Sequence, residues 1–512
     1  MRKKVLLRTI AASITMSPFA VASAADWMQF GYDAAHSGHN TAETFLSASN
    51  VSQIQRRWQA TLTSSVDSAP VYLSNVTTSG GVKDLLFLLA TNGTLMAVDA
   101  ANGTVLWHHQ ESGQNPTTSA PAIDPGRQYL YAYGLDGYVH KYRVDTGAEV
   151  SNGGWPELVT LKTGVEKVAG SLTIATSGST TYLYVVTDGY VGDFGDYQGH
   201  LTTINLANGD QNVFNSQCSD QLIHFDGGAN DCAWPMAGDT GGSGIWGRGG
   251  ATFDTGTNRV YIATGNGFFD ANTLDGFNWG DSVLALVPSG VPSRGGGLPD
   301  DSYTPTNFQE LEDQDADLGS TSLVILPVPS AHATQHLGVQ VGKDAAIRLL
   351  DLTNMSGTNL VGSIGGELQL LDVPQGGFNM SQQPATWVDA SGTTWLLIAN
   401  SSGVSGLKLR FTSIGAPFLE VEWSHSGNAR SAVVANGVLY YAAACGSSYC
   451  MYAADPVTGD VLWTSSEHLA ALHWQSPILV NSALYIADGT HLSRFDAGTA
   501  ADDTIFANGF DP

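Results

Sequence analysis

One recurring pattern strongly limits the folds that this chain can adopt. A run of β-branched and aromatic residues is followed by a glycine turn, a second such run, an aspartate and another glycine turn. Two clear copies are residues 86–107, LFLLATNGTLMAVDAANGTVLW, and residues 440–463, YYAAACGSSYCMYAADPVTGDVLW. The copies match at an aspartate, a glycine and a tryptophan: Asp99, Gly103 and Trp107, and Asp455, Gly459 and Trp463. Such self-similarity predicts a chain built from stacked copies of one small β unit.

Weaker copies of the same pattern complete a series of eight. They occupy residues 129–147, 182–209, 260–287, 337–351, 395–409 and 484–498. If each unit is a four-stranded antiparallel blade, the fold is an all-β, eight-bladed β-propeller spanning residues 25–499. The longest insertions between copies fall around residues 190–245 and 267–316, and insertions of this kind usually mark the working face.

The composition agrees with a β-fold and narrows the possible partners. The chain has 59 glycines, and its charged residues make up only 13%, about half of the usual ~25%. This balance argues against disorder and coiled coils. The formal net charge is −26, and an acidic surface repels phosphate backbones and anionic lipids. We therefore expect no nucleic-acid binding and no electrostatic docking to membranes.

The two ends of the chain read differently from the repeats. Residues 1–24 combine a basic start, an apolar middle and small residues at Ala22 and Ala24, which predicts a cleaved signal peptide and a periplasmic or secreted protein. Residues 500–512 form a short tail beyond the last repeat. No later segment is apolar for long enough to predict a membrane-spanning helix.

The four cysteines form two close pairs along the sequence. Cys218 and Cys232 belong to one segment, and Cys445 and Cys450 to another. An even number of cysteines in an exported chain favours disulfides. We expect each pair to close a small loop of its own.

The repeats also carry a family resemblance. The A-x-D-x-x-x-G-x-x-x-W pattern of residues 97–107 and 453–463 resembles the tryptophan docking motif of pyrroloquinoline-quinone (PQQ) dehydrogenases and their eight-bladed relatives. The opening DWMQFG of residues 26–31, followed by HSGHN at 36–40 and later Trp58, is similar to the start of that family. The resemblance implies the cofactor site of the family's enzymes. There PQQ stacks on a tryptophan in a central funnel, and a calcium ion bridges the PQQ to an acid, an asparagine and an aspartate.

The most specific match to that cofactor site lies in residues 244–286. This segment resembles one blade of the family at four places: Gly-Ile-Trp246, Asp254, the run YIATGNG that ends at Gly267, and the run DSVLAL that begins at Asp281. The resemblance implies that Trp246 is the stacking floor and Asn266 a calcium ligand. A planar quinone gains from a flat indole face, and a hard cation favours an amide oxygen.

Three further residues follow from the resemblance. The acidic segment 313–319, DQDADLG, resembles the stretch that carries the family's catalytic, calcium-bound aspartate. We assign that role to Asp315. A shifted register would put Gln314 or a neighbouring acid at this position. Lys343 resembles the cation that contacts the quinone, but Ala345 stands where the family has glycine. Asp196 in DFGDYQG is the candidate third calcium ligand, with Gln198 where the family has arginine.

The resemblance therefore implies an exported quinoprotein that oxidises a small alcohol with PQQ and calcium and passes electrons to an external acceptor. The alternative is a propeller without a cofactor that serves as a protein-binding scaffold, since its relatives include such proteins. An enzyme would gather Asp196, Asn266, Asp315 and Lys343 around one funnel above Trp246, whereas a scaffold would leave them scattered.

Overall fold

The computed structural model describes residues 25–114, 116–228, 232, 241–329, 332–377, 382–470 and 472–498. The predicted signal peptide, residues 1–24, and the predicted tail, residues 500–512, lie outside this part of the chain.

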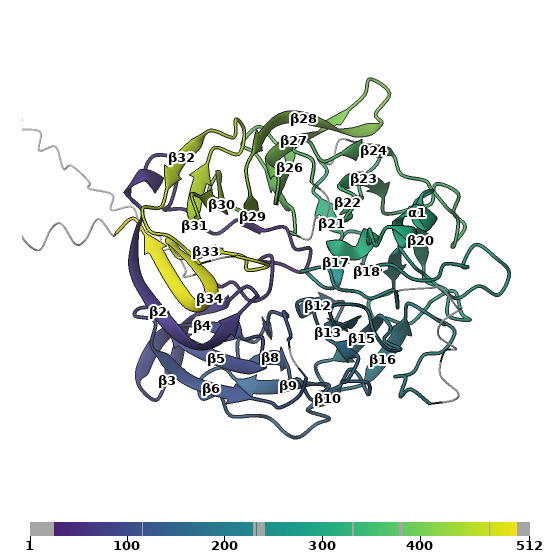
Figure 1. Ribbon diagram of the computed structural model, residues 1–512, viewed down its shortest axis with the longest axis horizontal. Coiled ribbons are helices and arrows are strands. Elements are labelled where there is room, and N and C mark those ends of the chain that lie inside the picture. Colours follow the sequence, from purple (N-terminus) through teal and green to yellow (C-terminus); the bar gives the residue numbers. More distant parts are fainter. Residues whose placement is uncertain are drawn as a thin grey trace, which may run out of the picture.

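Eight antiparallel sheets form a ring, with the chain passing from one to the next in order (Figure 1). This is the predicted eight-bladed propeller. The strands of the first four blades are β3 (Val71–Thr78), β4 (Gly81–Leu89), β5 (Thr94–Asp99) and β6 (Val105–Gln110); β7 (Ala122–Ile123), β8 (Tyr129–Tyr133), β9 (Tyr138–Arg143) and β10 (Glu157–Leu158); β12 (Thr173–Ser177), β13 (Thr180–Val186), β15 (His200–Asn205) and β16 (Gln211–Asn215); and β17 (Thr252–Asp254), β18 (Arg259–Ala263), β19 (Val283–Leu286) and β20 (Asp301–Tyr303).

The next three blades repeat this plan. Their strands are β21 (Val324–Leu326), β22 (Leu337–Val341), β23 (Ala346–Asp351) and β24 (Gln369–Asp372); β25 (Ala385–Val388), β26 (Thr394–Asn400), β27 (Gly403–Phe411) and β28 (Pro417–Ser426); and β29 (Ala429–Ala435), β30 (Val438–Cys445), β31 (Ser448–Ala454) and β32 (Val461–Thr464). The short β1 (His39–Asn40) adds to the seventh blade, parallel to β29.

The eighth blade joins the two ends of the propeller. It consists of β33 (Ile478–Val480), the long β34 (Ala483–Asp496) and β2 (Gln55–Val66), so it has three assigned strands rather than the predicted four. The antiparallel register of β2 and β34 pairs Gln55 with Asp496. An ion pair of 2.5 Å between Arg57 Nε and Asp496 Oδ1 supports the same closure.

A few elements lie outside the blades. β11 (Glu166–Lys167) and β14 (Asp188–Gly189) form a two-stranded sheet. The described helices are the short α1 (Phe308–Asp313) and the 3-10 turns η1 (Val51–Gln53) and η2 (Leu318–Ser320). None of the helices in the described ranges is long and apolar enough to cross a bilayer.

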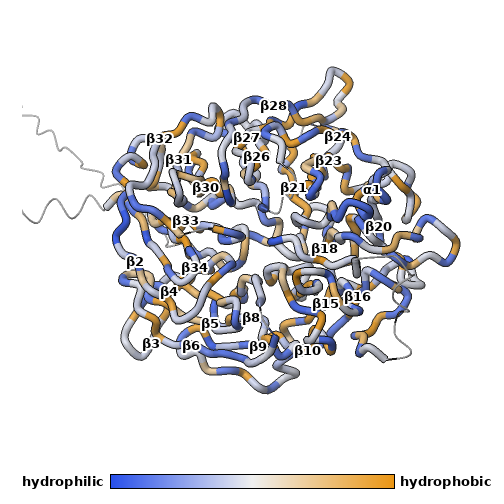
Figure 2. The backbone as a smooth tube through the Cα atoms, in the orientation of Figure 1, coloured by the Kyte–Doolittle hydropathy of each residue, from blue (hydrophilic) through white to orange (hydrophobic). Residues whose placement is uncertain are grey.

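Hydrophobic residues are spread around the whole ring of strands (Figure 2). At the seams, tryptophans pack against glycines of the following blade. A Cβ on Gly103 would lie 3.0 Å from the Trp58 ring, and one on Gly147 would lie 2.6 Å from the Trp107 ring. Both glycines also have a positive φ. The recurring glycine and tryptophan are therefore a docking pair, in which the missing side chain lets an indole lie on the backbone.

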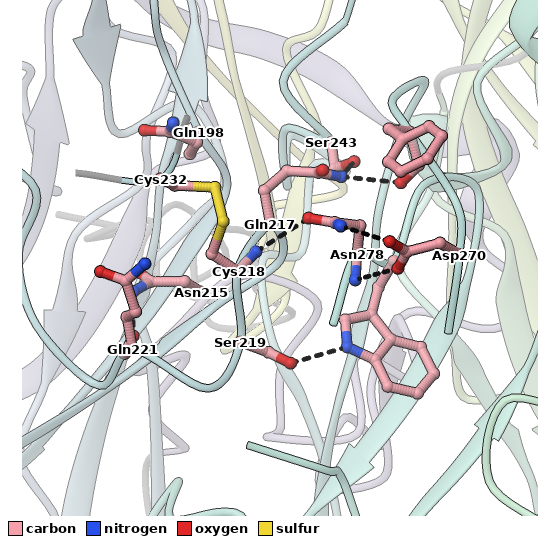
Figure 3. The surroundings of a disulfide bond; sticks show 12 residues. Gln198, Asn215, Gln217, Cys218, Ser219, Gln221, Cys232, Ser243, Asp270 and Asn278 are labelled. Atoms are coloured by element: carbon pink, nitrogen blue, oxygen red, sulfur yellow. Dashed lines mark hydrogen bonds between the residues drawn. A yellow bond between two sulfur atoms is a disulfide. The ribbon is translucent and has the colours of Figure 1, made fainter. Parts of the chain in front are cut away.

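Both predicted disulfides are confirmed: Cys218 bonds to Cys232, and Cys445 bonds to Cys450. Next to the first disulfide, hydrogen bonds connect the insertion after β16 to the insertion between β18 and β19 (Figure 3). Cys218 N donates to Asn278 Oδ1 at 3.0 Å, and Asn278 Nδ2 donates to Asp270 at 2.9 Å. Two insertions that are distant in sequence thus support each other.

Candidate functional site

A cavity of about 330 Å³ lies where five blades meet. Its lining residues come from strand ends, from turns between strands and from the segments that lead into the first strands: Trp246, Lys343, Gln382, Asn400, Ser401, Arg430, His473 and Trp474. Lys343 occupies the β22–β23 turn, and Ser401 the equivalent β26–β27 turn. Neighbouring strands of a blade run in opposite directions. The turn between the second and third strands therefore lies on the same face of the propeller as the start of the first strand. Arg430 lies at such a start, in β29. We call this cavity the funnel.

Two indoles dominate one side of the funnel. The rings of Trp246 and Trp474 have centroids 6.2 Å apart and cross at 43°. His473 stacks on Trp474 at 3.8 Å, and the Arg248 guanidinium lies 4.5 Å from the Trp474 centroid. Asp67, which follows β2, fixes this segment by accepting hydrogen bonds from His473 Nδ1 at 2.8 Å and Trp474 N at 2.9 Å.

Beside the indoles lies the carboxylate of Asp317. The backbone N–H of Asn266 donates to Asp317 Oδ1 at 2.7 Å, and the Asn266 side-chain amide faces the same carboxylate. Lys343 forms ion pairs with Asp317 and, at 2.9 Å, with Asp315 Oδ1, while its ammonium lies 5.3 Å from the Trp246 centroid. Burial lowers the pKa of Lys343, but the two aspartates outweigh it and raise the pKa overall.

Local backbone features make this arrangement possible. A Cβ on Gly265 would lie only 2.1 Å from Asp317 Oδ1, so a side chain there would displace this carboxylate. In the turn that carries Lys343, Ala345 has a φ of 56°. The turn therefore has the left-handed conformation that glycine adopts most easily, although alanine stands at this position.

Three more carboxyl groups near Asp317 have a raised pKa, and desolvation is the largest cause for each. Asp281 is buried and Asp188 half-buried, whereas Asp193 lies in an exposed loop. Asp281 accepts a hydrogen bond from Leu318 N at 2.8 Å, and Asp317 contributes to raising its pKa well above the usual range. Burial raises the pKa of Asp188 to about 7, although Lys167 opposes the shift. For Asp193, the charges of Asp317 and Asp315 add to the effect of burial, while the Tyr197 hydroxyl, which donates at 2.8 Å, opposes it.

The structure brings together four of the five residues predicted from the sequence. Trp246, Asn266, Asp315 and Lys343 meet at the funnel, but the Asp315 side chain is 67% exposed, whereas that of Asp317 is 9% exposed. Asp196 lies apart from them. Its side chain is 48% exposed, and its carboxylate is 3.8 Å from Lys162.

Several residues in or near the funnel are not among those predicted from the sequence. Asp193 and Asp317 stand two or three residues from the predicted acids, in the same segments. Trp474, His473 and Arg430 belong to none of the motifs described above. Their one signal is position, because each lies at or shortly before the first strand of a late blade.

The funnel carboxylates do not form a ready three-ligand cluster. Among the described residues, the sets of three His, Cys, Asp or Glu ligand atoms that lie within 4.8 Å of one another are Cys445, Cys450 and His468, and Glu111, His140 and Glu149. At the funnel, the side-chain NH2 of Asn266 faces the Asp317 carboxylate, so this amide must turn over before its oxygen and the carboxylate can bind one cation. Asp193 is a further acid, close enough to interact with the charges of Asp317 and Asp315.

The fold is shared with several solved structures. Quinohemoprotein alcohol dehydrogenase from Comamonas testosteroni is 16% identical with a TM-score of 0.61, over 93% of this chain and 81% of that chain. A europium-containing methanol dehydrogenase is 14% identical with a TM-score of 0.63, over 92% of this chain and 98% of that chain. Saccharomyces cerevisiae Sqt1 is 12% identical with a TM-score of 0.52, over 86% and 98%. At these identities the likeness concerns the fold alone.

The sequence itself matches a family model. No curated protein matches the chain in sequence. Residues 27–289 match the model described as PQQ: Glucose/ethanol/alcohol dehydrogenase, beta-propeller domain. This range includes the first three blades, most of the fourth blade, and both Trp246 and Asn266. The chain therefore belongs to the family of the glucose/ethanol/alcohol dehydrogenase β-propeller domain.

Proposed function

We propose that this protein is an exported quinoprotein-type oxidoreductase that oxidises an alcohol, with PQQ and calcium in the funnel. The observation that carries the proposal is the buried Asp317 carboxylate, held between Asn266 and Lys343 at the side of a cavity with an indole wall. A positioned carboxylate next to a cation and a flat aromatic surface is the set of groups that such a reaction needs.

The residues of the funnel fit these cofactors in kind. PQQ is a planar quinone with several carboxylates, for which Lys343 and Arg430 offer positive charge. Because the two indoles cross at 43°, a planar ring can lie flat on only one of them, and Trp246, beside Lys343, is the one we assign. The carboxylate of Asp317 suits calcium, as does the amide oxygen of Asn266 once that side chain turns over. We assign Asp193 as a third donor in preference to Asp196.

When bound, the quinone accepts a hydride equivalent and the calcium acts as a Lewis acid. The chain's own residues handle the proton. We assign Asp317 as the base that takes the proton of the substrate hydroxyl, because its carboxylate faces the funnel residues while that of Asp315 is largely in solvent. Asp315 is the alternative base, since it shares the ammonium of Lys343. Lys343 offsets the charge of Asp317 and can donate to an oxyanion.

The remaining parts of the proposal concern location and partners. The two disulfides agree with an oxidising compartment, such as the periplasm or the exterior. Electrons would leave to a separate acceptor. If the protein binds neither cofactor, the scaffold function replaces this one.

The test is a titration of the purified chain with PQQ and Ca²⁺, singly and together. We expect both together to raise the melting temperature and to quench tryptophan fluorescence, since a ligand at a hundredfold excess over its Kd stabilises the folded state by about 2.7 kcal/mol. Dye-linked alcohol oxidation should accompany this change. A chain that does not respond at millimolar Ca²⁺ and excess PQQ would contradict the proposal.

Two acids of one loop give a matched control for the calcium site. Asp193→Asn should weaken the Ca²⁺-dependent rise in melting temperature, because Asp193 lies close enough to Asp317 and Asp315 to interact with their charges. Asp196→Asn should leave this rise unchanged, because Asp196 faces Lys162. Equal effects of the two variants would remove Asp193 from the ligand set.

A further inference from the structure

A second group of potential ligands lies in the seventh blade. His468 Nδ1 is 3.4 Å from Cys445 Sγ and 3.8 Å from Cys450 Sγ. Cys450 is buried, Cys445 is half-buried and His468 is exposed, so reagents in solvent can reach the group from one side. The two sulfurs form a disulfide with each other.

The backbone holds these three residues in place without the help of the S–S bond. β30 and β31 pair in register from Leu439–Ala454 to Cys445–Ser448. The segment of His468 is tied to β31 at the next residue, because Leu469 N donates to Tyr449 O at 2.7 Å. Ala470 N also donates to Asp488 Oδ2 at 2.7 Å. The three side chains would therefore stay together if the disulfide were reduced.

Their spacing suits one metal ion. In a tetrahedral zinc site with Zn–S of about 2.3 Å and Zn–N of about 2.0–2.1 Å, a sulfur and a nitrogen ligand are about 3.6 Å apart. The two distances from His468 Nδ1 to sulfur lie on either side of this value. Two sulfurs at such a site are about 3.8 Å apart, a separation that they can reach only after the S–S bond breaks.

We propose that Cys445, Cys450 and His468 form a redox-gated site for a borderline or soft divalent ion such as Zn²⁺. In the oxidised chain the sulfurs are bonded and the site is closed. A dithiol reductant breaks the S–S bond by thiol–disulfide exchange, which leaves two thiols here and a disulfide in the reductant. Binding of Zn²⁺ then releases both thiol protons to solvent, while neutral His468 carries its proton on Nε2 and offers Nδ1. A disulfide oxidant reverses the sequence and expels the ion.

The site is separate from the funnel but borders it. Tyr449, next to Cys450 in sequence, has its ring 5.6 Å from the guanidinium carbon of Arg430, which lines the funnel. The proposal depends on neither PQQ nor calcium, so its outcome is independent of the proposed function.

The test uses the full-length chain and Co²⁺ as the probe. The folded protein is reduced with a phosphine, freed of reductant under argon and titrated with Co²⁺. We expect about one Co²⁺ per chain, with the sulfur-to-cobalt charge-transfer absorption that thiolate ligands give, and displacement by Zn²⁺. The same preparation left oxidised should not develop this absorption. Circular dichroism before and after reduction monitors the fold.

Two variants identify the ligands. His468→Ala keeps both cysteines and should bind Co²⁺ about tenfold more weakly or worse, with a changed absorption spectrum. A Cys218→Ser/Cys232→Ser double variant removes the other disulfide and should bind as the wild type does. The proposal is overturned if the reduced chain takes up no Co²⁺, if His468→Ala binds equally well, or if Cys445–Cys450 cannot be reduced without unfolding the protein.

Discussion

Buried aspartates have opposite surroundings in two regions of this propeller. In the first blade, Asp99 closes a turn: it accepts a hydrogen bond from Ala101 N at 3.0 Å, and Lys83 lies 2.5 Å from its other oxygen. In the fourth blade, Asp281 accepts one from Leu318 N, but its Oδ2 has no hydrogen-bond partner among the described residues. Asp99 is 3% exposed and Asp281 1%, so burial alone does not distinguish them.

The difference separates two uses of one residue type. The regular blades use aspartates to satisfy backbone groups, which stabilises the fold. The blades with long insertions bring several carboxylates close to one another, with few positive charges nearby. This arrangement lowers stability, and it leaves carboxylate oxygens that a ligand could contact. Four predictions test this comparison.

The largest effect should come from the acid beside the proposed cofactor site. If the proposed function holds, Asp317→Asn should lower kcat by about 10²–10⁴-fold, because an amide cannot take up the substrate proton. The matched variant Asp315→Asn should cost less than about tenfold, because that side chain is largely in solvent. Dye-linked rates of the two loaded variants decide the matter. A larger loss in Asp315→Asn would reverse the assignment.

The regular blades should lose most stability at the glycine–tryptophan seams. Gly147 and Gly153 have similar φ angles of 71° and 65°, but only at Gly147 would a Cβ meet the Trp107 ring, while at Gly153 nothing lies within 4 Å. We expect Gly153→Ala to lower the free energy of unfolding by about 1 kcal/mol, from backbone strain alone. Gly147→Ala should lower it by about 2–4 kcal/mol, because the clash is added. Urea unfolding of both variants measures the difference.

The two buried aspartates should respond to substitution in opposite directions. Burial and Asp317 raise the pKa of Asp281, so the folded state binds its proton more tightly, and stability falls as pH rises above the unfolded value near ~4. Asp281→Asn removes this loss and should stabilise the cofactor-free chain by about 2 kcal/mol at pH 8, and by less at pH 5. Asp99→Asn should destabilise it at pH 8. Melting curves of the cofactor-free protein at both pH values test this, and equal signs for the two variants would refute the comparison.

The smallest effect concerns a histidine of the second blade. Burial lowers the pKa of His140, but Asp136 and Glu149 outweigh it and raise the pKa to about 8. The stabilisation is therefore present below about pH 6.5 and is lost as pH rises through 8. A pKa raised from 6.5 to about 8 corresponds to about 2 kcal/mol. Because solvent screens the partly exposed carboxylates of Asp136 and Glu149, we expect the wild type to lose about 1 kcal/mol more stability than His140→Gln between pH 6 and pH 9. Denaturant titrations at the two pH values measure it, and parallel losses would exclude the histidine as the cause.

The fold could be predicted from the sequence because its determinants are local. A docking pair such as Gly147 and Trp107 recurs at fixed spacing, and both disulfides join cysteines within one segment. The site could be predicted only in part. Trp246, Asn266 and Lys343 stand in motifs, but the choice of Asp317 over Asp315 depends on which side chain the loop turns inward. The choice of Asp193 over Asp196 depends on which acid lies near the Asp317 carboxylate. Trp474 reaches the funnel through contacts between distant blades, which no local pattern reveals.

The pairing of β2 with β34 has a consequence for how the molecule is made. It joins strands that are more than 400 residues apart in sequence, so the ring cannot close until β34 has been synthesised and, if the protein is exported, translocated. The same closure positions part of the funnel, because Asp67, just after β2, holds His473 and Trp474. A nascent chain that lacks β34 therefore has no complete funnel, and the order of synthesis delays the completion of this cavity until the ring is closed.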